Sequence, residues 1–80
     1  MREKLLELMQ NRPFIPFRIE LSSGTVHVIR HPDQAMLAQS LVFIGVPKSD
    51  SQGPDFADVA IVSLLHIVKL ELLQTSSMAG

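Results

Sequence analysis

The sequence Asp58-Val-Ala-Ile-Val-Ser-Leu-Leu-His-Ile-Val-Lys-Leu-Glu-Leu-Leu73 contains two runs that are typical of β-strands. Residues 59–62 and 67–72 are rich in Val, Ile and Leu, and neither Gly nor Pro separates them. Small β-barrels join consecutive strands in this way, through a short corner in place of a hairpin loop. The stretch therefore predicts a strand, a tight corner at residues 63–66 and a further strand.

A β-hairpin is predicted upstream, in residues 17–30. Residues 17–21 alternate apolar and polar side chains, which indicates a strand with one buried face. Ser22-Ser23-Gly24 follows as the turn, where Gly24 is free to adopt a positive φ. Residues 25–30 then return as the second strand, with Val26 and Val28 expected to face the core.

The N-terminal segment has the spacing of a short amphipathic helix. In residues 2–11, Leu5, Leu8 and Met9 share one face, and Pro13 marks the end. Pro13 and Pro16 favour an extended lead-in to the first strand. Because about ten residues are too few for a stable isolated helix, we expect this one to pack across an open end or a face of the sheet.

The middle of the chain predicts one helical turn and one more strand. Pro32 suits the first position of a helix, and Asp33 suits its positive end. Residues 41–46 are apolar almost throughout, which favours a strand covered on both faces, with a bend or bulge at Gly45. Residues 47–58 read as a polar loop, and residues 74–80 as a disordered tail.

These elements predict one domain in residues 1–73 with a mainly β (α+β) fold. The expected architecture is a five-stranded small barrel with a short N-terminal helix. The predicted core consists of Phe17, Ile19, Leu21, Val26, Val28, Phe43, Ile61, Val68 and Leu70.

The composition predicts association with another protein surface. The chain has 80 residues, no Cys, 46% hydrophobic residues and only 5% aromatic residues. A domain of this size buries only roughly 60% of its unfolded surface, and no disulfide stabilises it. We therefore expect part of its apolar surface to be covered by a second copy of the chain or by another protein.

The charge and the apolar runs argue against several classes of protein. The formal net charge is −1, so no overall basic field favours nucleic acid or anionic lipid. No apolar run approaches the roughly 18 residues that a membrane span needs. The N-terminal residues 1–4 include both Arg and Glu, unlike a signal peptide, and a cytoplasmic protein is expected.

Metal binding and catalysis are not favoured. His27 and His31 would lie about 13 Å apart along a strand, at roughly 3.3 Å per residue, too far for one zinc ion. Asp50, Asp55 and Asp58 lack the spacing of an EF-hand loop, although their segment is rich in oxygen ligands. Because no serine stands in a nucleophile motif and no glycine-rich phosphate loop is present, we predict neither an enzyme nor a bound cofactor.

The order of elements resembles the SH3-like or Sm-like barrel over residues 2–73. In the bacterial Sm-like RNA chaperone, a Lys-His pair near the corner before the last strand contacts RNA, and rings form by strand pairing between subunits. His66 occupies a similar place here, with Leu65 where that family has Lys. The resemblance implies a small barrel and, as an alternative function, RNA binding.

A second resemblance is closer in amino-acid sequence. Arg12-Pro-Phe-Ile-Pro-Phe-Arg-Ile-Glu-Leu-Ser-Ser-Gly24, with Arg30-His-Pro32 and Val62-Ser-Leu-Leu-His-Ile-Val68, is similar to a group of short, uncharacterised bacterial proteins found in planctomycetes. This resemblance implies a fold but no site.

The sequence thus favours a non-enzymatic interaction or assembly module that forms a homo-oligomer, with an Sm-like RNA-binding protein as the alternative. The candidate interaction residues are Arg18, Arg30, His31 and His66. The chain has no Trp or Tyr on which unstacked bases could lie, so only weak RNA binding is expected. Another protein is the remaining candidate partner.

Overall fold

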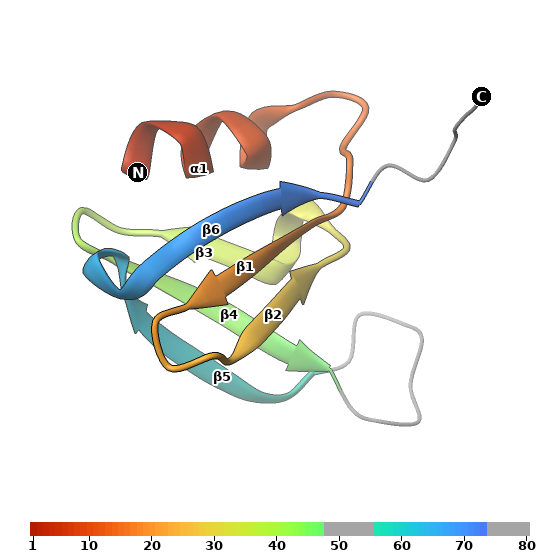
Figure 1. The fold of residues 1–80 in the computed structure, drawn as a ribbon. Coiled ribbons are helices and arrows are strands. Elements are labelled where there is room, and N and C mark those ends of the chain that lie inside the picture. The colour runs from red at the N-terminus through yellow and green to blue at the C-terminus, as the bar shows by residue number, and fades with distance from the viewer. Residues whose placement is uncertain (48–55, 74–80) are drawn as a thin grey trace.

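The computed structural model describes residues 1–47 and 56–73, which form one short helix and two antiparallel sheets of three strands each (Figure 1). One sheet has the order β2-β1-β6 and the other β3-β4-β5. The helices are α1 (Arg2–Gln10) and the 3-10 turns η1 (Pro32–Gln34) and η2 (Leu64–His66). The strands are β1 (Phe17–Leu21), β2 (Val26–Ile29), β3 (Ala35–Leu37), β4 (Leu41–Pro47), β5 (Phe56–Ser63) and β6 (Ile67–Leu72).

The mainly β class with an N-terminal helix is confirmed, but the prediction of a five-stranded barrel is wrong, because the two sheets do not close into a barrel. The described residues contain six strands in two sheets. The difference arises at η1, where the predicted helical turn at Pro32 is confirmed. This turn separates β2 from β3, a strand of three residues that the sequence did not predict, so the two strands join different sheets.

The β1–β2 hairpin is confirmed, although the inward face of β2 is not the predicted one. Gly24 in the turn has φ 93°, a conformation that other residues rarely adopt. Opposite residues in an antiparallel pair share a face, and Phe17 pairs with Ile29. Ile29 is therefore buried, whereas Val26 is 39% exposed and Val28 is half-buried.

The predicted corner between the last two strands is also confirmed. Ser63 caps η2, and its Oγ accepts a hydrogen bond of 3.3 Å from the Leu65 amide. β6 then pairs with β1, with Lys69 opposite Glu20 and Ile67 opposite Leu21.

Val68 lies at the irregularity in this pairing, between the partners of Glu20 and Leu21. One extra residue in β6 changes which side chains share a face. Ile67 is therefore buried, Leu70 packs against the core, and Val68 is 56% exposed. The prediction that Val68 belongs to the core is wrong for this reason.

The apolar strands β4 and β5 also turn the opposite face inward from the one predicted. Val42, Ile44 and Val62 are buried, whereas Phe43 is half-buried and Ile61 is 63% exposed. Phe43 and Ile61 are therefore not core residues, and β4 is not covered on both faces. Both strands are apolar at inward and outward positions, so alternation along the chain does not identify the buried face.

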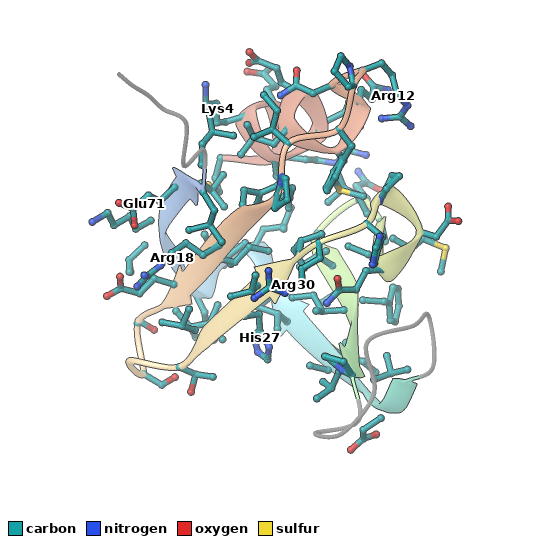
Figure 2. The ribbon with its side chains drawn as sticks, turned by 90° about the vertical axis from the view of Figure 1, so that its right-hand side faces the viewer. Lys4, Arg12, Arg18, His27, Arg30 and Glu71 are labelled. Atoms are coloured by element: carbon teal, nitrogen blue, oxygen red, sulfur yellow. The ribbon has the colours of Figure 1, made fainter. Side chains whose placement is uncertain are left out.

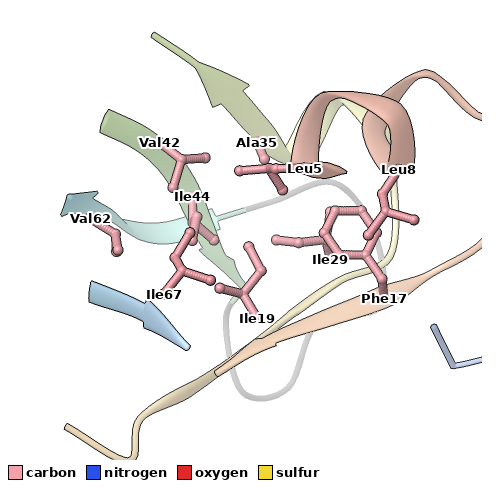
Figure 3. Close-up of a cluster of buried hydrophobic side chains, with 10 residues drawn as sticks. All are labelled: Leu5, Leu8, Phe17, Ile19, Ile29, Ala35, Val42, Ile44, Val62 and Ile67. Carbon is pink, nitrogen blue, oxygen red and sulfur yellow. The ribbon is translucent and has the colours of Figure 1, made fainter. Parts of the chain in front are cut away.

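The core lies between the two sheets and is closed at one end by α1 (Figures 1 and 3). Leu5 and Leu8 of the helix are buried there, as expected for a helix that covers an open end. The Arg2 side chain fastens α1 to the segment after β3 by donating to the Ala38 carbonyl at 3.2 Å. The buried cluster comprises Leu5, Leu8, Phe17, Ile19, Ile29, Ala35, Val42, Ile44, Val62 and Ile67.

Candidate functional site

The outward side of the β3-β4-β5 sheet carries a patch of apolar side chains, here called the apolar outer face, in which exposed side chains lie around the half-buried Phe43. Its residues are Met36, Phe43, Val59 and Ile61. Met36 pairs with Phe43, and Phe43 pairs with Ile61, so these three form one row across the sheet. Met36 is 64% exposed, Ile61 63% and Val59 56%. The inward side of the same strands contributes Ala35, Val42, Ile44 and Val62 to the core, so most of the sheet is apolar on both sides.

A hollow lies in the apolar outer face above Gly45. Gly45 pairs with Val59 on the neighbouring strand and has no side chain to fill the space beside it. The hollow has a volume of about 280 Å³ and is mostly apolar, with Asp33 at its border. Its lining residues are Asp33, Gln34, Ala35, Met36, Phe43, Gly45 and Val59.

Gln34 fixes the backbone beneath this hollow. The residue is 5% exposed, and its Nε2 donates to the carbonyls of Val28 at 2.8 Å and Gly45 at 3.0 Å. Its Oε1 accepts from the Arg30 amide at 2.8 Å. One amide therefore links β2 to β4 where no strand pairing joins the two sheets, and it satisfies three backbone groups.

The four candidate interaction residues do not form one cluster, because His66 lies apart from Arg30 and His31. The amide of Ser22 donates to the His66 carbonyl at 2.8 Å, so His66 lies beside the turn between β1 and β2. Arg30 and His31 follow the other end of β2 and are exposed. About 13 Å of strand separates the two ends, at roughly 3.3 Å per residue.

Arg18 lies on the outward side of the β2-β1-β6 sheet and faces Glu71 (Figure 2). Its Nε is 3.5 Å from Glu71 Oε1, without the geometry of a hydrogen bond. The two side chains are 38% and 46% exposed, so this is a surface ion pair. The charge of Arg18 is thus partly offset by a neighbouring carboxylate.

His66 borders a second groove, of about 350 Å³, between the β1–β2 turn and the end of β5. Ser22, Ser23 and Ser63 also line this groove, but Ser23 Oγ donates to Thr25 Oγ1, and Ser63 Oγ caps η2. In the described residues no hydrogen bond joins the His66 ring to a serine hydroxyl. The groove therefore shows no pairing of a nucleophile with a base.

Within residues 1–47 and 56–73, no three His, Asp or Glu side chains lie close enough to hold a metal ion. His27 lies opposite Ile19 on β1, and His31 stands before η1. The loop carboxylates considered for calcium are Asp50, Asp55 and Asp58, of which Asp50 and Asp55 lie outside the described residues. No helix in this part of the chain is long and apolar enough to cross a membrane.

The sequence predicted Phe43 and Ile61 as core residues, and it did not single out Met36 or Val59 as core or interaction residues. The sequence nevertheless indicated an apolar surface. Residues 41–46 and 59–62 are apolar at successive positions, so both faces of each strand carry apolar side chains. Such a strand lies either between two layers of its own chain or with one side open to another surface.

No protein-family model matches the chain, and no curated protein or solved structure matches it either.

Proposed function

We propose that the protein is a non-enzymatic interaction module that works as a homo-oligomer. The observation that carries this proposal is the apolar outer face, where three side chains that are more than half exposed surround Phe43. Full burial of a Val, Ile or Met side chain stabilises by roughly 1.5–3 kcal/mol relative to exposure. Four neighbouring side chains therefore offer a substantial gain to any partner that covers them.

The order of elements supports a small fold of SH3-like or Sm-like type. β2 is an edge strand of one sheet and β3 an edge strand of the other, and η1 connects them. A helix precedes the first strand, and a tight corner precedes the last strand. Folds of this type serve many functions, so this likeness concerns the architecture and not the activity.

The test is the mass of the protein in solution across a range of concentrations. Light scattering coupled to size exclusion is expected to return at least twice the chain mass of 8.9 kDa at micromolar concentration. The apparent mass should fall on dilution, as mass action requires. A constant mass of 8.9 kDa up to high concentration would contradict self-association, and another protein would then be the remaining kind of partner.

An Sm-like RNA-binding protein is the second candidate. The exposed His66 at the η2 corner and the exposed Arg30 favour it. Two observations weigh against it: Arg18 faces Glu71, and Phe17 is buried against Phe14 with a centroid distance of 5.9 Å. With no Trp or Tyr in the chain, stacking of about 1–3 kcal/mol per base is mostly lost.

A further inference from the structure

We propose that the occupant of the apolar outer face is the same face of a second copy, in a two-fold arrangement that packs the two β3-β4-β5 sheets against each other. This inference rests on the proposed function and specifies the surface that assembles the oligomer. It differs from strand pairing at an open edge, because the contact is made by side chains and not by the backbone.

The charge distribution separates this face from the other sheet. The outward positions described on β3, β4 and β5 are uncharged: Met36, Leu41, Phe43, Gly45, Val59, Ile61 and Ser63. The outward side of the β2-β1-β6 sheet instead has Arg18, Glu20, Lys69 and Glu71. In a two-fold interface a charge near the axis meets its own copy, so a face whose strands carry no outward charge suits self-association, and Asp33 lies only at the border of the hollow.

The shape of the face supplies both parts of a self-complementary contact. Ile61 projects from β5, and the hollow lies diagonally across from it above Gly45, because Ile61 pairs with Phe43 and Val59 pairs with Gly45. A two-fold axis along the line from Phe43 to Val59 places each Ile61 over the partner's hollow. Phe43 and Val59 then lie near the axis and contact their own copies.

Edge pairing alone would not cover the face. β5 is an edge strand of its sheet, and another strand could add to it. Met36 lies on β3, at the opposite edge, and would remain exposed. Met36 therefore distinguishes packing of the face from strand pairing at the β5 edge.

The first experiment uses the absence of cysteine from the chain, since a single introduced thiol can react only with its own copy. Packed sheets lie about 10 Å apart, beyond the roughly 7 Å that limits a disulfide between α-carbons. A short bismaleimide is therefore the probe. The Val59→Cys protein should be cross-linked as a covalent dimer, whereas the Leu65→Cys protein, with its thiol on η2 at a position where Leu65 is 92% exposed, should remain mostly without a cross-link.

The second experiment places a charge on the face. Ile61→Lys and Met36→Lys should each raise the dissociation constant at least tenfold, while Leu65→Lys leaves it unchanged. Both side chains are more than 60% exposed, so thermal unfolding should show that the variants remain folded. The measured quantity is the dissociation constant from sedimentation equilibrium.

The outcomes separate this inference from the proposed function. An oligomer that survives Met36→Lys and shows no Val59→Cys cross-link would overturn the face contact and leave self-association standing through an edge. A wild-type protein that remains monomeric would overturn both. Loss of the oligomer in the two face variants, together with the Val59→Cys cross-link, would support both.

Discussion

The side-chain amide of Gln34 donates a hydrogen bond of 3.0 Å to the carbonyl oxygen of Gly45, joining η1 to the middle of β4. The same amide also binds Val28 and Arg30, so one buried side chain replaces strand pairing where the two sheets separate. The hollow in the apolar outer face lies above this contact, and its floor is therefore held by hydrogen bonds as well as by packing.

Substitution of Gln34 should destabilise the fold strongly. Gln34→Ala removes three hydrogen bonds and leaves partly buried backbone groups unpaired, so we expect a loss of about 3 kcal/mol in the free energy of unfolding. Urea denaturation measures it. A loss below about 1 kcal/mol would show that water replaces the amide.

The Gln34→Glu variant tests the direction of these hydrogen bonds. It keeps an acceptor for the Arg30 amide, but an ionised carboxylate would face the carbonyl oxygens of Val28 and Gly45. The protonated form can still donate one hydrogen bond. The destabilisation relative to wild type should therefore be largest at neutral pH and smaller near about pH 4, where protonation of a carboxyl begins. A pH-independent difference would contradict this geometry.

Replacing Ile by Ala should reduce the free energy of unfolding strongly on the inward face of the β3-β4-β5 sheet and hardly at all on its outward face. Ile44→Ala empties a fully buried site and should cost about 2–5 kcal/mol. Ile61→Ala, on the outward face, should change the stability of the monomer by about 0.5 kcal/mol or less. Unfolding must be followed at a concentration that keeps the chain monomeric. Equal effects would mean that the two faces are assigned wrongly.

The helix α1 should contribute to stability through Leu5. Leu5 has 0% exposure, and Leu5→Ala should cost about 2–5 kcal/mol, although Ala is the stronger helix former. The neighbouring Leu6 is only half-buried and serves as a matched control with a smaller loss. Thermal unfolding compares the two variants. Equal losses would show that α1 does not pack by this face.

Binding of single-stranded RNA should be weak and dependent on salt. Arg18 and Arg30 offer few phosphate contacts, so the affinity should stay in the non-specific range, roughly 10⁻⁴–10⁻⁶ M. Fluorescence anisotropy at several salt concentrations measures it, and added salt should weaken RNA binding but not an apolar protein contact. Submicromolar affinity at physiological salt, lost in the Arg18→Ala/Arg30→Ala variant, would instead favour the Sm-like function.

The sequence predicted the positions of the helix, turns and strands better than it predicted which face of each strand is buried. The hairpin, the turn at Pro32 and the corner at residues 63–66 have local signals, namely alternation, turn residues and the absence of Gly or Pro. The inward position of Ile29 depends on the length of the turn, because Leu21 donates to the Thr25 carbonyl and this sets the pairing. Turn length is visible in the sequence, but several turn geometries are compatible with it.

The candidate site was less predictable, for a physical reason. Phe43 and Ile61 are as hydrophobic as Val42 and Val62, so only the packing of the second sheet decides which pair is buried. Arg18, Arg30, His31 and His66 were chosen by residue type, and the fold then places His66 at the opposite end of β2 from Arg30 and His31. Gln34 was not selected because a lone glutamine has no distinguishing pattern in one sequence.

The bulge at Val68 marks the position at which strand β6 can lose one residue. Elsewhere in a paired strand, the loss of one residue turns every later side chain to the opposite face. Val68 is the residue that interrupts alternation, since Ile67 and Leu70 both face inward. A chain that lacks Val68 would alternate regularly, with Ile67 opposite Leu21 and Leu70 opposite Ile19 as before. A one-residue deletion there is therefore compatible with the whole β1–β6 register, and it is the length variation that this strand can absorb.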